Sequence, residues 1–363
     1  MKENLTFVCD PVLSGFGPIR PAILIAKQFV AKGFNVKILS PHINESMRRY
    51  LETLGVSSIS LERKTFFKDE SLTWFQLWFE EALFSRNSRK VRNLEGIVIN
   101  FSNSIAVPSQ IWYAQGPPTL TLDNMKKYLS LNYRLVYSLG APLFKRGDKT
   151  LNKKFAQLSK KIIANSHYLA NIYKKLGLKI HKVVYPPLDC NEFKPTTTQP
   201  TGDYVLTYFG KETIFPIIKE IADRKIKIKA FGGKLTTVPK SFLQNPYIEV
   251  LGHIPTKKLV NLYSNALFTL YPFSDEPFGY IPVESMACGT PVLTFNRQGP
   301  RESVLQNTTG WLVENSKEIV NLATILWKQK YPQSIRKACR KRAMFFDIKN
   351  VSKEWFNLLK MSD

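Results

Sequence analysis

Short apolar runs alternate with longer amphipathic stretches along both halves of the chain. Near the start, residues 5–9 predict a buried strand, residues 21–32 a helix, and residues 36–39 a second strand. Two glycines, Gly15 and Gly17, lie in the turn after the first strand. This strand–helix–strand order with a glycine-rich turn is typical of an α/β fold built on a doubly wound parallel sheet.

The same alternation begins again after a proline-rich passage around residues 186–200. In the first half, further strands are expected at 96–101, 110–114 and 162–164; in the second half, they are expected at 204–209, 226–231, 247–251 and 267–271. The prolines indicate a linker. We therefore predict two Rossmann-like doubly wound domains, residues 1–185 and 186–345.

Composition limits the class of protein. The chain has 363 residues, 44% of them hydrophobic and 22% charged, which is enough for two packed cores. No apolar run is long enough to cross a bilayer, and the four cysteines have neither metal-ligand nor disulfide-framework spacing. We expect a cytoplasmic protein, with contact to the inner face of a membrane as a further option.

The formal net charge of +24 indicates an affinity for polyanions or phosphorylated substrates. Basic patches lie at residues 86–92 and 336–342, without any zinc-finger, helix-turn-helix or RNA-binding motif beside them. Nucleic acid is therefore the weaker choice of partner. The aromatic stretch at 66–84 is read either as a core helix or as an amphipathic helix that contacts anionic lipid.

The most informative segment covers residues 275–292. It has the order of a loop, a helix and a strand, with Glu276 on the loop and Glu284 expected in the first helical turn. Unpaired amides at Phe278, Gly279 and Tyr280 are expected to form a phosphate site at the helix start. Two carboxylates beside it can accept hydrogen bonds from sugar hydroxyls. A nucleotide sugar fits both features, whereas for an isolated acid pair favourable contact with the helix dipole is the simpler explanation.

The segment closely resembles the E-x7-E signature of retaining glycosyltransferases of family 4, which have the GT-B fold. Pro277 and Ser285 stand where the family usually has Gly and Ala. The resemblance implies transfer of a hexosyl group from a nucleoside diphosphate to an acceptor hydroxyl with retention of configuration. It also implies a last helix, about residues 346–363, that returns to the first domain.

The resemblance assigns roles to particular residues. Glu284 is expected to hold the ribose hydroxyls, and Glu276 the hydroxyls of the transferred sugar. Lys211 stands at the position of an arginine that the family uses on the donor diphosphate, a less specific cation than a bidentate guanidinium. The resemblance also implies a second cation a few residues later, for which Lys219 is the candidate.

The resemblance implies that Gly15 and Gly17 of the first domain face the donor diphosphate. Gln115 lies where many relatives have a histidine; it can hydrogen-bond a substrate hydroxyl but cannot act as a general base. No acid pair for a divalent ion stands out, so no metal and no cofactor is expected. The donor, such as a UDP- or GDP-hexose, is a substrate, and the acceptor is expected to be a glycan, glycolipid or lipid-linked oligosaccharide.

Other functions remain open at the level of sequence. A phosphorylase or a sugar-nucleotide epimerase of the same fold is a second enzymatic reading. A basic polyanion-binding protein with a vestigial sugar site is the third, and Gln115 together with the short segment after Lys211 favours it. The donor base and the acceptor depend on packing that the sequence does not specify.

Overall fold

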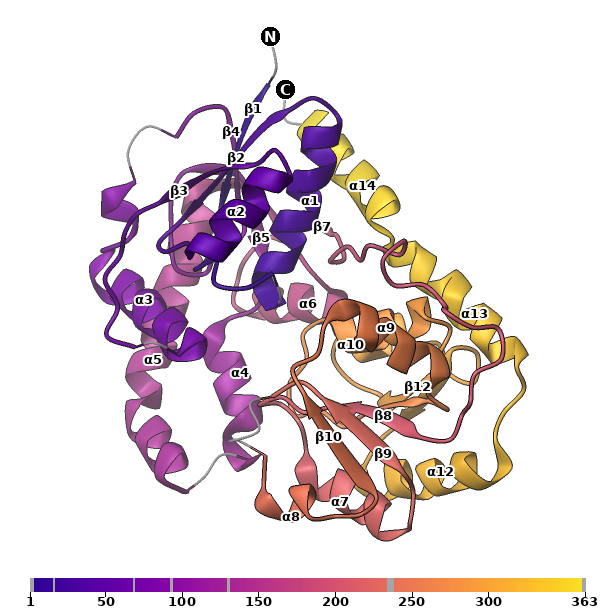
Figure 1. Ribbon diagram of the computed structural model, residues 1–363. Helices are drawn as coiled ribbons and strands as arrows, with labels where there is room; N and C mark the ends of the chain where they lie inside the picture. Colours follow the sequence, from indigo (N-terminus) through magenta and orange to yellow (C-terminus); the bar gives the residue numbers. More distant parts are fainter. Residues whose placement is uncertain are drawn as a thin grey trace. The chain divides into compact units, whose positions relative to one another are not determined.

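A computed structural model describes residues 3–15, 17–67, 69–91, 94–128, 131–233 and 238–360 (Figure 1). The chain divides into two compact units. Unit 1 comprises Met1–Pro187 and Val351–Asp363, and unit 2 comprises Leu188–Asn350. Each unit is built on one parallel sheet.

The sheet of unit 1 has seven strands in the order β3-β2-β1-β4-β5-β6-β7, and every pairing is parallel. The strands are β1 (Asn4–Val8), β2 (Asn35–Ser40), β3 (Ser57–Ser60), β4 (Ile97–Asn100), β5 (Ser109–Ala114), β6 (Ser159–Ala164) and β7 (Lys182–Val183). The helices are α1 (Arg20–Ala31), α2 (Glu45–Thr53), α3 (Glu70–Phe84), α4 (Pro118–Met125), α5 (Leu131–Leu158), α6 (His167–Lys175) and most of α14 (Ile348–Lys360).

Alternate side chains of β5 lie in two different hydrophobic cores, so both faces of this sheet are buried. Ile111 and Tyr113 lie in one core with residues of α1 and α2, whereas Trp112 and Ala114 lie in a second core with residues of α3, α5 and α6. Successive side chains of a strand point to opposite faces, so helices must cover both. Trp355 of α14 is fully buried in the first core, so the end of the chain packs into unit 1.

The sheet of unit 2 has six parallel strands in the order β10-β9-β8-β11-β12-β13. The strands are β8 (Val205–Tyr208), β9 (Ile228–Phe231), β10 (Ile248–Gly252), β11 (Thr269–Tyr271), β12 (Val292–Phe295) and β13 (Gly310–Val313). The helices are α7 (Phe215–Asp223), α8 (Lys240–Leu243), α9 (Thr256–Asn265), α10 (Tyr280–Ala287), α11 (Pro300–Ser303), α12 (Ser316–Gln329) and α13 (Ser334–Ala343). Strand order reverses between β8 and β11, the position at which open α/β sheets bind ligands.

The aromatic stretch at 66–84 contains α3, which is a core helix along much of its length. Leu77 and Trp78 are buried, and Phe75, Trp78 and Phe79 pack against Phe144 of α5. Asp69 caps the helix by accepting hydrogen bonds from the amides of the first turn. Aromatic side chains at both ends are exposed nevertheless, with Phe66 at 90% and Phe84 at 50%. Within the described residues, we find no helix with the length and hydropathy needed to span a bilayer.

Candidate active site

The loop–helix–strand unit predicted around the two glutamates forms in unit 2. α10 begins at Tyr280, directly after Gly279, and Pro282 lies in its first turn. Gly279 has φ = 95°, a left-handed conformation that L side chains rarely adopt. Glu276 precedes the helix, as expected. Glu284 is the fifth helical residue, so the prediction that it lies in the first turn is wrong.

Glu276 is held by groups on both sides of its carboxylate. The Tyr271 hydroxyl at the end of β11 donates to Oε2, and the Gly279 amide donates to Oε1 over 3.0 Å. Its own amide donates to Oε1 of Gln298 at 2.5 Å. The expectation that the Gly279 amide is unpaired is therefore wrong, because Glu276 accepts its hydrogen bond.

The electrostatic surroundings favour the protonated form of Glu276. Burial is the largest cause, followed by the nearby Glu212 carboxylate, and together they raise the pKa of Glu276 to about 8 against an ordinary value of 4.5. The hydrogen bond from Tyr271 acts in the opposite direction, and the Asp275 carboxylate adds to the increase. A strongly shifted acid at the carboxyl end of a parallel sheet indicates a functional position.

Glu284 is 5% exposed and is also fixed by a phenol. The Tyr263 hydroxyl on α9 donates to Oε2 of Glu284 over 3.1 Å. Helix α10 thus contributes the acid, and helix α9 contributes the hydroxyl that orients it. A rigid carboxylate of this kind suits a hydroxyl-bearing ligand, because fewer rotamers must be fixed on binding.

Tyr208, the last residue of β8, lies in the electrostatic field of three acids of unit 2. Burial raises its pKa first, and the carboxylates of Glu212, Glu276 and Glu284 raise it further. A Cβ atom added to Gly232 would lie 2.2 Å from Cε2 of the Tyr208 ring, so only glycine fits there. The ring therefore lies against the strand-end glycines and close to all three acids.

Lys211 is exposed in the turn after β8. Its charge lowers the pKa of the adjacent Glu212, although burial makes the net shift of that group upward. Lys211 is therefore an exposed cation next to Glu212, at the reversal of strand order. Lys219 lies on α7 and forms an ion pair with Asp223 at 2.7 Å, which gives the expectation about Lys219 no support.

The site residues expected in the first domain lie in unit 1. Gly15 precedes and Gly17 begins the short 3-10 helix η1 (Gly17–Ile19). Gln115, directly after β5, donates from Nε2 to the carbonyls of Pro18 and Phe101 at 3.0 and 2.9 Å. It thereby ties together the loops that follow β1 and β4.

Sequence reasoning missed Tyr208, Glu212 and Gln298. Glu212 directly follows Lys211, the expected cation of the diphosphate site. An acid next to that cation was the signal available in the sequence. Gln298 has a left-handed backbone at φ = 54°, and it accepts a hydrogen bond from Glu276 across 22 residues of sequence. Nothing in its local pattern indicates that contact.

Comparisons with known proteins show what this chain is similar to. Residues 233–343, which include both glutamates, match the model of the family described as Glycosyl transferases group 1. The alpha-1,3/1,6-mannosyltransferase ALG2 of Mus musculus is 25% identical over 197 residues, covering 43% of this chain and 47% of the relative. The corresponding enzyme alg-2 of Neurospora crassa is 38% identical over 78 residues, covering 21% of this chain and 17% of the relative. The chain thus matches less than half the length of these curated relatives.

Solved structures resemble the chain over nearly its full length. Anabaena Alr3699/HepE, in complex with UDP, has a TM-score of 0.70 at 16% identity, covering 99% of this chain and 100% of that chain. Sucrose-phosphate synthase from Thermosynechococcus elongatus has a TM-score of 0.72 at 15% identity, covering 99% of both chains.

Two parallel-sheet units of this kind define a protein of the GT-B fold. The segment of unit 2 that carries both glutamates matches the group 1 glycosyltransferases.

Proposed function

We propose that this protein transfers a hexosyl group from a nucleoside-diphosphate sugar to an acceptor hydroxyl, with retention of configuration. The observation that carries the proposal is the pair of fixed carboxylates, Glu276 and Glu284, in the unit that also carries the exposed Lys211 after β8. In support, a structural neighbour was solved with UDP-glucose, and several curated relatives are named mannosyltransferases. The acceptor is proposed to be a glycan or a lipid-linked saccharide.

The main barrier in such a reaction is departure of the charged nucleoside diphosphate. Lys211 would stabilise the negative charge that develops on the leaving phosphate oxygen. In the proposed front-face route, that oxygen takes the proton of the acceptor hydroxyl as the new glycosidic bond forms on the same face. Neither glutamate acts as a nucleophile. Glu276 accepts hydrogen bonds from hydroxyls of the transferred sugar, and Glu284 accepts them from the ribose.

Replacing Glu284 with alanine is expected to raise the KM for the donor by about 10- to 100-fold, because one or two charge-assisted hydrogen bonds to the ribose disappear. Tyr263→Phe should raise it only a few-fold, since the carboxylate remains but loses its 3.1 Å anchor. Release of nucleoside diphosphate over a range of donor concentrations measures both. A normal KM for the Glu284→Ala variant would exclude the assigned role.

We further propose that unit 1 contacts an anionic membrane surface. Three leucines of α5, Leu135, Leu139 and Leu143, are exposed at a spacing of four residues, and Leu139 is 85% exposed. This spacing places them on one helical face. The exposed cations Arg146 and Lys149 follow on the same helix. Apolar side chains flanked by basic ones are typical of interfacial helices.

Replacing the three leucines by serine should remove most binding to anionic vesicles in a sedimentation assay. The wild-type protein should bind less at high salt, because ions screen the contribution of the cations. Leu243→Ser, a single change at an exposed leucine of unit 2, is the control and should leave binding unchanged. Equal sedimentation of the triple variant and the wild type would contradict the proposal.

A further inference from the structure

A cavity of about 780 Å³ lies in unit 1, and none of the residues assigned to the transfer reaction lines it. It is lined by Gly96 before β4, Ser109 at the start of β5 and Lys160 at the start of β6. These positions are the amino ends of three neighbouring parallel strands. Substrates of α/β sheets bind at the carboxyl ends, so this cavity belongs to a different edge of the sheet.

Three cations line the cavity: Arg89, Lys154 and Lys160. None of the described residues lining it is acidic, and the hydroxyls of Ser85 and Ser88 lie beside the cations. Arg89 and Lys160 are exposed and form no ion pair within the described part of the chain. The cavity therefore carries positive charge that the surrounding protein leaves uncompensated.

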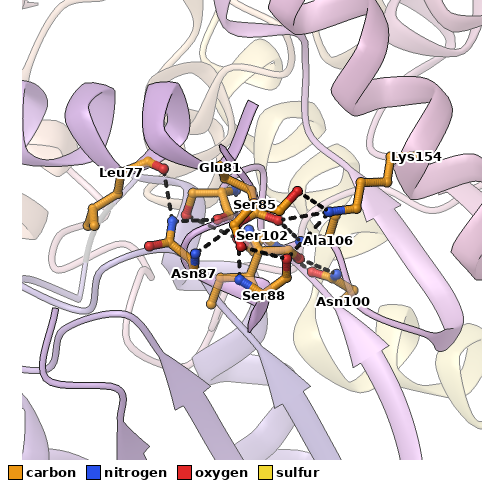
Figure 2. A network of polar contacts seen from close by, with 11 residues as sticks. Leu77, Glu81, Ser85, Asn87, Ser88, Asn100, Ser102, Ala106 and Lys154 are labelled. Atoms are coloured by element: carbon orange, nitrogen blue, oxygen red, sulfur yellow. Dashed lines mark hydrogen bonds and ion pairs between the residues drawn. The ribbon is translucent and has the colours of Figure 1, made fainter. Parts of the chain in front are cut away.

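Lys154 is the fixed member of this group (Figure 2). Its Nζ donates to Oε1 of Glu81 at 3.3 Å, to Oγ of Ser85 at 2.8 Å and to Oγ of Ser88 at 3.4 Å. The Glu81 side chain is fully buried, and it also accepts hydrogen bonds from the amides of Asn87, Ser88 and Ala106. The amides help to stabilise the carboxylate, so Lys154 is held in place rather than free to rotate.

The wall that carries Arg89 is also fixed. Asn87 is fully buried, and its side-chain amide donates to the carbonyls of Leu77 on α3 and Ser104 after β4, both at 2.8 Å. These bonds hold the turn between α3 and β4 against the sheet. The cavity is thus built by a buried polar network and does not depend on surface side chains alone.

The rest of the lining is largely apolar. Val91, Leu94, Val107 and Leu158 contribute aliphatic side chains. Because cations and hydroxyls contribute the polar part of the lining and hydrocarbon the rest, the ligand must combine an anionic group with an apolar part. The volume is within the range of small-molecule sites, roughly 300–1,000 Å³.

We infer that this cavity binds a phosphate monoester attached to an apolar group, with the phosphate on Arg89, Lys154 and Lys160. Lysine and arginine are the usual protein partners of phosphate oxygens. The ligand is either the headgroup region of an anionic lipid or a water-soluble phosphorylated metabolite. The inference does not depend on the transfer reaction, since no residue of the proposed donor site lines the cavity.

Calorimetric titration with three probes tests the inference: monomeric dihexanoyl phosphatidic acid, dihexanoyl phosphatidylcholine and inorganic phosphate. We expect phosphatidic acid to bind and phosphatidylcholine not to bind. Phosphatidic acid should bind more tightly than inorganic phosphate, because the aliphatic lining contacts its acyl chains, and equal binding would contradict the apolar part of the inference. A comparison with phenyl phosphate, a water-soluble monoester, then separates the two sources: tighter binding of phosphatidic acid supports a lipid, and tighter binding of phenyl phosphate supports a soluble metabolite.

The double variant Arg89→Ala/Lys160→Ala should weaken binding at least tenfold, because it removes two of the three cations while leaving the Glu81–Lys154 pair intact. The control, Lys174→Ala/Lys175→Ala, removes two exposed lysines of α6 that do not line the cavity. Thermal unfolding of both variants checks that they fold. No binding of either phosphorylated probe, or the same loss in both double variants, would overturn the inference.

Discussion

The Glu276→Gln variant should turn over the donor about 100- to 1,000-fold more slowly than the wild type, the loss typical of removing one fixed electrostatic group from a reacting centre. Glutamine keeps the size of the side chain and one oxygen for the Tyr271 hydroxyl or the Gly279 amide, but it has no second oxygen to accept from both. The comparison is made at pH 9, where Glu276 is ionised and glutamine lacks its negative charge. The hydroxyls of the transferred sugar would then lose the acceptor that positions them.

The effect should appear mainly in kcat, whereas Glu284→Ala should appear mainly in the KM for the donor. Steady-state measurement of nucleoside diphosphate release separates the two. Gln298→Ala is the matched control, because it removes the partner of the Glu276 amide and leaves the carboxylate itself in place. A Glu276→Gln variant with wild-type kcat would show that the carboxylate does not act on the transferred sugar.

The raised pKa of Glu276 gives a further signature of the same site. Below pH 8 the acid of the free enzyme is largely protonated, so kcat/KM should increase as pH rises through about 8. The free energy of unfolding changes with pH in the opposite direction. The folded pKa of Glu276, about 8, lies above its ordinary value of 4.5, so this acid contributes stability that is fully present below pH 4.5 and is lost as pH rises through 8. Glu276→Gln should therefore raise Tm relative to the wild type at pH 9 and not at pH 4. A kcat/KM profile that is flat between pH 6 and 9 would contradict this assignment.

The second large effect concerns the folding of unit 1. Asp10 follows β1 and is 6% exposed, and its carboxylate accepts hydrogen bonds from the Ser102 and Ser104 hydroxyls, both at 2.6 Å. The amides of Asn103 and Ser104 donate to it as well, at 3.1 and 3.0 Å. Asp10→Ala removes the acceptor that these buried donors share, although the Ser104 amide keeps Oγ of Ser102 as a partner at 2.8 Å. The change should lower the free energy of unfolding by about 4 kcal/mol.

Hydrogen exchange of the β1 and β4 amides measures this loss within unit 1, without requiring the whole chain to unfold in one step. Asp10→Asn should lose less, because its side-chain oxygen can still accept from the serine hydroxyls. Ser104→Ala removes one of the hydroxyls that donate to Asp10 and leaves the carboxylate in place, and should cost about 1 kcal/mol. Unchanged protection in Asp10→Ala would mean that these hydrogen bonds contribute little net stability.

The sequence predicted the elements whose pattern is local. The parallel sheets, the returning C-terminal helix and the unit around Glu276 and Glu284 follow from apolar strands, strand-end glycines and a long signature. α5 was not predicted. It contains Gly140 and Pro142, both unfavourable in a helix interior, and packing of Phe144, Leu151 and Phe155 into the second core of unit 1 compensates for them.

The sequence motifs named the candidate site residues that lie within a single segment, but not the residues that other elements contribute. Glu276 and Glu284 lie in one segment, and Lys211 follows a strand-end glycine, so all three could be named from sequence. The phenols that orient the acids come from other elements: Tyr263 from α9 and Tyr271 from β11. Tertiary packing brings them to the acids, so neither their roles nor the raised pKa of Glu276 could be predicted from local pattern.

Calorimetric titration of the wild-type protein with a panel of nucleoside-diphosphate hexoses tests the central claim most directly, because it needs no acceptor. We predict that at least one UDP- or GDP-hexose binds, and that Glu284→Ala weakens that binding at least tenfold. Failure of every member of the panel to bind, or equal affinity in the variant, would contradict the assignment of the two glutamates to a nucleotide-sugar site.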